Sequence, residues 1–424
     1  MRVLLVGGGG REHALAWNLA ESPSVDGLIA APGNAGIEEI ADCRPVTADD
    51  VAGLVELAGR ELVDLVVVGP EAPLVAGLVD ELDARGISAF GPTAAGARIE
   101  GSKVWAKELC VALGLPTARS ETFTDAREAE RYLAEMTPPY VVKAEGLAAG
   151  KGVTVAATRE EAIAALQAAL VERRFGDAGA RVLVEEFLEG REVSALALTD
   201  GETVIPLAPA QDFKRASDGD AGPNTGGMGA YSPVPFVDEP LWTTIVEQIL
   251  EPAVRGLRDR GIRYRGVLYA GLMLTADGPK VLEFNCRFGD PETQAIVPRL
   301  DSDLAELLAA SATGTLGDAK VMWRPEPCVT VILASGGYPE AYETGVPIEG
   351  IEEASALKDV RVFHSGTARQ EGRVVTAGGR VLAVSALGKD LAEARARAYE
   401  AVSLISFKGM HHRTDIAKEA ASGE

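Results

Sequence analysis

The chain is poor in the residues that build disulfide frameworks and zinc sites. It has 4 cysteines and 4 histidines in 424 residues, and they are dispersed, with no Cys-x-x-Cys pair. Disulfide scaffolds and structural zinc sites need such residues at close, regular spacings. The sequence therefore argues against both kinds of site.

Long apolar segments are missing as well. The N-terminus reads MRVLLVGGGG, and its apolar stretch is too short for the hydrophobic region of a signal peptide. No run of the sequence approaches the roughly 20 apolar residues of a membrane-spanning helix. We therefore expect to find the protein in the cytoplasm.

Positive charge is scarce, since 41 lysines and arginines stand against 63 acidic residues and the formal net charge is −22. A chain this acidic is not expected to bind nucleic acid or a membrane surface, and most of its charge serves solubility. Because the overall field repels anions, an anionic substrate must be attracted by basic residues gathered at one place.

The composition that remains is that of a large globular protein, with 47% hydrophobic and 25% charged residues. We expect an α/β and α+β multidomain fold. Residues 1–101 alternate short apolar strands with helical runs, and each strand ends in glycine or proline, which predicts a doubly wound parallel sheet. Residues 102–318 predict a mixed α+β region with a subdomain near 120–192. Residues 319–424 predict a smaller α+β domain after a linker at 316–327.

The most informative stretch is 280–294, KVLEFNCRFGDPETQ. Alternate side chains of a β-strand point to opposite faces. One face would then carry Glu283, Asn285 and Arg287 beside Val281, and the other would be a core face formed by Leu282, Phe284, Cys286 and Phe288. Carboxylate and amide oxygens suit a hard cation such as Mg²⁺, and a guanidinium suits a phosphate or carboxylate. The pattern favours a metal and anion site over an edge strand with a solvated polar face.

The first glycine-rich loop, Gly7–Gly10, begins like a dinucleotide-binding fingerprint but does not complete it. The sixth position of that motif is Glu12, and no acidic residue closes the second strand to hold a ribose. An NAD site is therefore not expected. The loop and the following helix N-terminus either accept a simple phosphate or form only a tight turn. On the first alternative, Gly9 and Gly10 are candidate substrate contacts.

A second glycine-rich segment, GLAAGKG at 146–152, resembles a P-loop without being one. Three residues instead of four separate its glycines, and Gly152 stands where a serine or threonine would bind Mg²⁺. Strand-like sequence lies on both sides of it. A loop of this kind between two strands can fold over phosphates as a flap. The candidate residues are Lys143, Gly146, Gly150, Lys151 and Gly152.

Two further segments carry candidate binding residues. In RVLVEEFLEGREVS, at 181–194, an apolar strand enters a connector that offers backbone groups to an adenine, although the segment taken alone favours a plain strand end. Its candidates are Glu185, Glu186, Phe187 and Leu188, with Glu192 for a ribose. In QDFKRASDGDAGPNTGGMGAY, at 211–231, an irregular loop combines cations with hydrogen-bond donors suited to a small carboxylate. Its candidates are Asp212, Lys214, Asn224, Thr225 and Gly226.

Taken together, these motifs resemble the glycinamide ribonucleotide synthetase family, also called phosphoribosylamine–glycine ligases, of the ATP-grasp superfamily. The resemblance runs nearly end to end and is carried by VGGGGREHAL, KAEGLAAGKGV, EEFLEGREVS, GPNTGGMGAYSP, RFGDPETQ, ASGGYP and FKGMHHRTDIA. The run RFGDPE is specific to the family, whereas the glycine-rich flap indicates only the superfamily. The family pattern departs at two positions, where Glu145 replaces the usual aspartate and Phe213 replaces the usual histidine.

The resemblance implies a reaction in which ATP, glycine and 5-phosphoribosylamine give ADP, phosphate and glycinamide ribonucleotide, an early step of purine synthesis. It implies a central ATP-grasp domain at 102–318 between the N- and C-terminal domains. Phosphates would contact Lys103, Lys143 and Lys214, and magnesium or manganese would be held by Glu283 and Asn285. A monomer acting on small molecules is expected.

The expected chemistry needs no nucleophile from the protein. The glycine carboxylate would attack the γ-phosphate of ATP, and the amine of phosphoribosylamine would then displace phosphate from the glycyl phosphate. Arg287 is the candidate for orienting glycine or phosphate, and Asp290 for binding the substrate ammonium. Another ATP-grasp ligase or carboxylase, and a non-catalytic nucleotide-binding regulator, are the alternatives.

Overall fold

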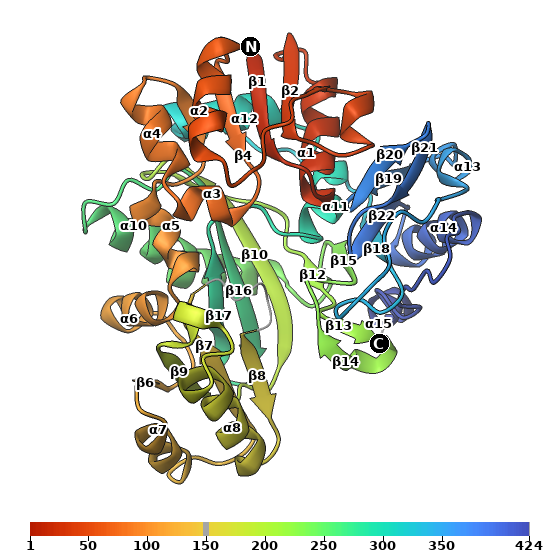
Figure 1. Cartoon of the computed structure of the whole chain (residues 1–424). Helices are drawn as coiled ribbons and strands as arrows, with labels where there is room; N and C mark the ends of the chain where they lie inside the picture. Colours follow the sequence, from red (N-terminus) through yellow and green to blue (C-terminus); the bar gives the residue numbers. More distant parts are fainter. Residues whose placement is uncertain (147–151, 424) are drawn as a thin grey trace.

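The structure is a computed structural model that describes residues 1–146 and 152–423 (Figure 1). Within these ranges the chain forms an N-terminal α/β domain, a central antiparallel sheet with a smaller subdomain below it, and a C-terminal α+β domain at the side. None of the helices described there is both long enough and apolar enough to cross a membrane.

The N-terminal region forms the predicted doubly wound parallel sheet, with strands in the order β3-β2-β1-β4-β5. The strands are β1 (Arg2–Gly7), β2 (Gly27–Pro32), β3 (Asp42–Cys43), β4 (Leu65–Val68) and β5 (Ser88–Phe90). The helices are α1 (Gly10–Glu21), α2 (Val51–Arg60), α3 (Glu71–Val75), α4 (Leu78–Ala84) and α5 (Ala94–Gly101). The sequence predicts a single helical run up to Arg85. It is divided into α3 and α4 because Gly77 takes a left-handed φ of 89°.

Helix α6 (Lys103–Leu113) leads into the subdomain, and the hydroxyl of Ser102 caps it by accepting from the Trp105 N–H. The subdomain sheet has the order β6-β9-β7-β8. Its elements are β6 (Ser120–Phe123), α7 (Ala126–Leu133), β7 (Tyr140–Ala144), β8 (Val153–Ala156), α8 (Arg159–Leu166) and β9 (Val182–Glu186). Figure 1 shows it below the central sheet, and it has an apolar core of its own.

The central sheet has the order β11-β10-β16-β17 and is antiparallel. Its strands are β10 (Arg191–Thr199), β11 (Val204–Pro206), β16 (Gly266–Thr275) and β17 (Gly278–Asn285). The associated helices are α9 (Glu239–Ile245), α10 (Glu251–Arg258), α11 (Glu292–Ile296) and α12 (Leu304–Thr313).

Strand β17 departs from the predicted alternation. The pairing with β16 shifts by one residue at Leu282, which has no direct partner. A β-bulge of this kind reverses the faces on its two sides. The side chain of Val281 therefore does not share the polar face, and it packs in the same core as Phe284 and Cys286. The strand also ends at Asn285, so that Arg287 lies beyond it.

The C-terminal sheet has the order β12-β15-β18-β22-β19 and recruits two strands from the middle of the chain. Its strands are β12 (Gln211–Asp212), β15 (Gly229–Ser232), β18 (Cys328–Ala334), β19 (Val360–His364) and β22 (Arg380–Leu387). Two hairpins and three helices accompany it: β13 (Arg215–Ser217) with β14 (Ala221–Asn224), β20 (Thr367–Gln370) with β21 (Arg373–Thr376), α13 (Ile351–Ser355), α14 (Leu391–Leu404) and α15 (Lys418–Ser422). The segment 211–231, predicted as an irregular loop, thus contains four short strands.

The stretch 316–327 is not a free linker. Leu316 is fully buried, and the backbone of Arg324 donates to the carbonyl of Arg299 at 2.7 Å. The stretch packs on the central domain because its apolar side chains, Leu316 and Trp323, outweigh its glycine and proline content.

Candidate active site

Near the end of β17, the carboxylate of Glu283 lies among lysines from three different elements. Lys103 opens α6, Lys143 lies on β7, and Lys214 directly precedes β13. Burial alone would raise the pKa of Glu283, but Lys214, Lys143 and Lys103 outweigh it and hold this pKa below its usual range. Glu283 is therefore an anion at neutral pH. The three lysines around it form a local positive field that can attract phosphates to an otherwise acidic chain.

The oxygen donors at this point fit a magnesium ion. Among the described residues the Glu283 carboxylate has no hydrogen-bond or ion-pair partner, and two residues on, the amide oxygen of Asn285 accepts a 3.3 Å contact from Arg287. Mg²⁺ in nucleotide sites commonly takes one or two protein oxygens and completes its shell with phosphate oxygens and water. The described ranges contain no group of three or more His, Cys, Asp or Glu side chains able to hold a metal alone. The metal would therefore be bound together with a nucleotide.

Lys143 is held by a buried chain of ion pairs. Its ammonium lies 2.6 Å from the carboxylate of Glu185, which also lies 2.6 Å from the ammonium of Lys107 on α6. Lys143 further donates to the carbonyl of Leu282 at 2.9 Å. Because an ammonium has three donors, one N–H of Lys143 is left for a ligand such as a phosphate. Lys107 was missed by sequence reasoning, since nothing in a helical sequence indicates which lysine faces inward.

The connector after β9 offers backbone groups and an apolar wall, but few side-chain groups. The side chain of Glu185 faces the lysines, and that of Glu186 accepts from the backbone N–H of Arg119 at 2.9 Å. The N–H groups of Phe187 and Leu188 have no backbone acceptor within the described part of the chain. The Leu188 side chain is buried in an apolar cluster with Ala118, Met273 and Leu282. This combination suits a flat heteroaromatic base.

The two ends of the glycine-rich segment can be described. Lys103 donates to the carbonyl of Gly146 at 2.5 Å, and the carbonyl of Gly152 accepts from the backbone N–H of Ala144 at 2.7 Å. The candidates Gly150 and Lys151 lie outside the described residues. Burial lowers the pKa of Lys103, against the opposing effect of Glu283.

Lys214 is paired with the residue predicted to hold a ribose. Its ammonium lies 2.6 Å from the carboxylate of Glu192. Burial alone would lower the pKa of Lys214, but Glu192, Asp212 and Glu283 raise it well above the usual range, so the lysine stays charged. Burial raises the pKa of Asp212. Lys214 opposes this effect, whereas Glu292 and the other nearby carboxylates reinforce it. A substrate ammonium placed beside Asp212 would relieve that repulsion.

Arg287 does not reach outward as its position in the sequence suggests. Its guanidinium donates to Glu100 at 2.9 Å and to Glu71 at 3.3 Å, and also to the carbonyl of Phe288. These two acidic partners offset the positive charge of Arg287 and so weaken its attraction for an anion. The strand ends before Arg287 and turns it toward the N-terminal domain, where it braces Asn285.

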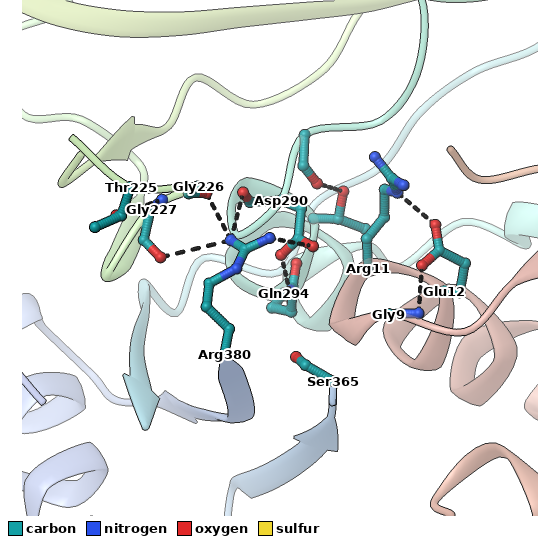
Figure 2. Close-up of polar contacts among 12 residues, drawn as sticks. Gly9, Arg11, Glu12, Thr225, Gly226, Gly227, Asp290, Gln294, Ser365 and Arg380 are labelled. Atoms are coloured by element: carbon teal, nitrogen blue, oxygen red, sulfur yellow. Dashed lines mark hydrogen bonds and ion pairs between the residues drawn. The ribbon is translucent and has the colours of Figure 1, made fainter. Parts of the chain in front are cut away.

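The N-terminus of α1 is already occupied by a carboxylate of the protein. Glu12 accepts from the backbone N–H of Gly9 at 2.7 Å and is paired with Arg11 at 2.6 Å. A phosphate bound by that N–H would have to displace Glu12. Gly9 nevertheless lies beside Asp290, since a Cβ added to Gly9 would meet the Asp290 carboxylate at 3.8 Å, and a Cβ on Gly10 would meet Ser365 and Gln294 (Figure 2).

Asp290 joins the central domain to the C-terminal domain through an arginine that the sequence did not reveal. One carboxylate oxygen accepts from Arg380 of β22 at 2.8 Å and the other from Gln294 at 2.7 Å (Figure 2). Arg380 also donates to the carbonyls of Gly226 and Asp290 at 2.6 and 2.9 Å. Arg380 and Arg11 overcome the effect of burial and keep the pKa of Asp290 below its usual range. Each oxygen keeps a lone pair for a substrate cation.

The loop residues next to Gly226 mostly hold the loop itself together. Thr225 donates from both its backbone N–H and its hydroxyl to the carbonyl of Lys214, at 2.7 and 2.9 Å. The amide oxygen of Asn224 accepts from Arg215 at 3.3 Å. These contacts join Asn224, Thr225 and Lys214 into one unit.

Replacing Arg380 with methionine is expected to raise the KM for the two substrates that would lie near Asp290 and to lower the unfolding free energy by about 2 kcal/mol. The reason is that Asp290 loses its charge partner, and the loops at Gly226 and Asp290 lose the hydrogen-bond donor that they share. Steady-state kinetics and urea unfolding would measure both effects. Arg369→Met, which removes an exposed arginine paired with Glu38 and Glu39, is the control. An unchanged KM in the Arg380 variant would contradict this role.

A flap subdomain and a central antiparallel sheet together bring lysines around a carboxylate suited to magnesium. This arrangement is that of an ATP-grasp enzyme, a class of ATP-dependent ligases. Sequence models of phosphoribosylglycinamide synthetase match the chain in three parts: the N domain at residues 1–100, the ATP-grasp (A) domain at 101–293 and the C domain at 328–419. The chain belongs to this family, also named the phosphoribosylamine–glycine ligases.

Individual relatives agree with this assignment. The chain is 51% identical to the phosphoribosylamine–glycine ligase of Rhizobium meliloti over 424 residues, covering 100% of both chains. It is 52% identical to that of Streptomyces coelicolor, covering 99% of this chain and 100% of the relative. The crystal structure of the Thermotoga maritima phosphoribosylamine–glycine ligase is similar with a TM-score of 0.86 and 34% identity, covering 98% of this chain and 100% of that one.

A more distant likeness shows the fold alone. The biotin carboxylase domain of the Hydrogenobacter thermophilus 2-oxoglutarate carboxylase, solved with MgADP, is 16% identical with a TM-score of 0.77, covering 100% of this chain and 95% of that one. The ATP-grasp architecture is thus shared with enzymes of other substrates.

Proposed function

We propose that the protein joins glycine to 5-phosphoribosylamine in purine biosynthesis, using ATP and releasing ADP and phosphate, through a glycyl phosphate intermediate. The observation that carries this proposal is the Glu283 carboxylate, which lies among Lys103, Lys143 and Lys214 and has no partner in the described part of the chain, in a chain that belongs to this family. Such an arrangement positions phosphates and neutralises their charge, which is most of what phosphoryl transfer requires of a protein.

In this proposal each part of the site has one task. The connector Glu185–Leu188 binds the adenine and Glu192 lies near the ribose. Lys103, Lys143 and Lys214 bind phosphate oxygens, and Gly146, Gly150, Lys151 and Gly152 are assigned to the same ATP. Glu283 and Asn285 hold the metal, which supplies charge neutralisation at the transferred phosphate when bound. Mg²⁺ is the metal expected, with Mn²⁺ as a substitute.

The substrates would lie between this cluster and Asp290. Asp212 and Asp290 are proposed to bind the ammonium or amine groups, and the loop Asn224–Gly226 with Gly9 and Gly10 lines the same space. Arg287 is reassigned from substrate contact to bracing Asn285, because its donors are used by Glu100 and Glu71. The protein is proposed to act as a cytoplasmic monomer with domains at 1–101, 102–318 and 319–424.

Phosphate release measured with one component omitted at a time tests the reaction. We expect release only when ATP, Mg²⁺, glycine and 5-phosphoribosylamine are all present. Release with aminoimidazole ribonucleotide and bicarbonate in place of the two substrates would identify a carboxylase instead. Binding of ATP without any turnover would identify a nucleotide-binding regulator.

A further inference from the structure

The C-terminal segment 411–415 lies along the β13–β14 hairpin, which directly follows Lys214. His411 contacts the carbonyl of Ala216 at 2.7 Å, and the backbone N–H of Thr414 donates to Asp218 at 2.8 Å. In return, the backbone N–H of Gly219 donates to Asp415 at 2.8 Å. Residues almost 200 positions apart in the sequence are thus joined by hydrogen bonds along β13 and the turn of the hairpin. The proposed function gives this contact no task.

At the centre of this contact is Arg413, whose side chain is only 1% exposed. Its guanidinium binds Asp415 through two hydrogen bonds of 2.7 and 2.8 Å. It also donates to Asp220 at 2.7 Å and to the carbonyl of Arg215 at 3.1 Å. Its flat face lies over the ring of Phe213, 5.0 Å from the ring centre. A buried arginine with this many partners is rigid.

These contacts fall on both neighbours of Lys214. Arg413 stacks on the residue before it, Phe213, and bonds the backbone of the residue after it, Arg215. The backbone of Lys214 is held by Thr225 and its ammonium by Glu192, at 2.6 Å. Lys214 is therefore fixed at both ends of its side chain and on both sides of its backbone.

We propose that Arg413 is a positioning residue that holds Lys214 in place for phosphoryl transfer. This role rests on the proposed function, in which Lys214 binds a phosphate oxygen. It gives the C-terminal domain a part in the chemistry although none of the groups assigned to the nucleotide comes from that domain. It also accounts for Phe213, where the family usually has histidine: the ring packs between Arg413 and Tyr231 and provides a flat surface for the guanidinium.

Replacing Arg413 with methionine is expected to lower kcat about 100-fold, the size of effect that a displacement near 1 Å of a catalytic group produces. The affinity for ADP, measured by calorimetry, should fall much less than kcat, because the adenine connector and Lys143 do not contact the hairpin. Hydrogen exchange of residues 213–224 should become faster. Arg413→Lys, which keeps the charge but loses the flat fork, should be intermediate.

Asp220→Asn is a milder variant that removes the negative charge of one partner of Arg413 without disturbing the fold. The Asp220 side chain is 69% exposed, and its left-handed φ of 51° is one that asparagine adopts readily. It should lower kcat less than Arg413→Met does. The control is Arg397→Met, which removes an arginine of the same domain that pairs with Glu393 and Asp359 and does not touch the hairpin. Its kcat should equal that of the wild type.

A double-mutant cycle with Lys214→Met separates positioning from general destabilisation. If Arg413 acts through Lys214, Arg413→Met should lower kcat in the wild type and have no further effect in the Lys214→Met background. Equal losses in both backgrounds, or wild-type kcat in both Arg413→Met and Asp220→Asn, would overturn the inference. Wild-type kcat in Lys214→Met itself would instead overturn the proposed role of the lysine.

Discussion

Replacing Glu283 with glutamine is expected to lower kcat by about 10³-fold. A metal ion contributes several kcal/mol to a phosphoryl transition state, and each 1.4 kcal/mol is a factor of about ten in rate. Glutamine keeps the shape of the side chain but removes the charge that both the metal and the three lysines need. Kinetics over a range of Mg²⁺ concentrations, with circular dichroism as a check of folding, would measure the effect.

The matched control for Glu283 is Asp277→Asn. Asp277 is a carboxylate of the same β16–β17 hairpin, but it is exposed at the turn and pairs loosely with Lys280 at 3.7 Å. Its loss should leave kcat and the Mg²⁺ dependence unchanged. A folded Glu283→Gln variant with wild-type turnover would contradict the metal assignment.

The second large effect is expected from Glu185→Gln, in stability as well as in activity. Glu185 is 2% exposed and neutralises two buried lysines, Lys107 and Lys143. Removing one partner from a buried ion pair costs about 3–5 kcal/mol, because the charges left behind stay desolvated. The affinity for ATP should fall too, since Lys143 loses the group that aims it. Urea unfolding and nucleotide titration would measure the two effects.

The loss of stability in Glu185→Gln should depend on pH in a defined direction. Lys143 and Lys107 outweigh the effect of burial and hold the pKa of Glu185 below its ordinary value of 4.5. Its contribution is therefore fully present above pH 4.5 and is lost as the pH falls toward the lower folded value. The difference in unfolding free energy between wild type and variant should shrink in acid. The double variant with Lys107→Met should be more stable than Glu185→Gln alone. A single variant as stable as the wild type at pH 7 would contradict the buried ion-pair chain.

The sequence was sufficient for features that depend on local pattern. Strands that end in glycine or proline predicted the parallel N-terminal sheet. The unusual face of β17 pointed to Glu283 and Asn285 because the requirements of a hard cation can be read from residue type alone. The family motifs then supplied the reaction, which no single pattern could.

Features that depend on distant partners could not be predicted. The bulge at Leu282 is set by the pairing with β16, so it changes the face of Val281 without any local signal. Arg287 is paired with Glu71 and Glu100, two acidic residues about 200 positions earlier, and nothing near it in the sequence indicates these partners. Lys107, Arg380 and Arg413 look like ordinary basic residues until the fold brings their partners to them. Strands β12 and β15 lie in a segment that the sequence predicts to be a loop. They form a sheet only because β15 pairs with β18 of another domain.

The most direct test of the account uses glycine labelled with ¹⁸O in its carboxylate. If the carboxylate attacks the γ-phosphate and the amine of 5-phosphoribosylamine then displaces phosphate from the glycyl carbon, one carboxylate oxygen leaves with the phosphate. Mass spectrometry of the inorganic phosphate should therefore find one ¹⁸O for each glycinamide ribonucleotide formed. Phosphate without ¹⁸O, released at the same rate as product, would contradict activation of glycine as an acyl phosphate at this site.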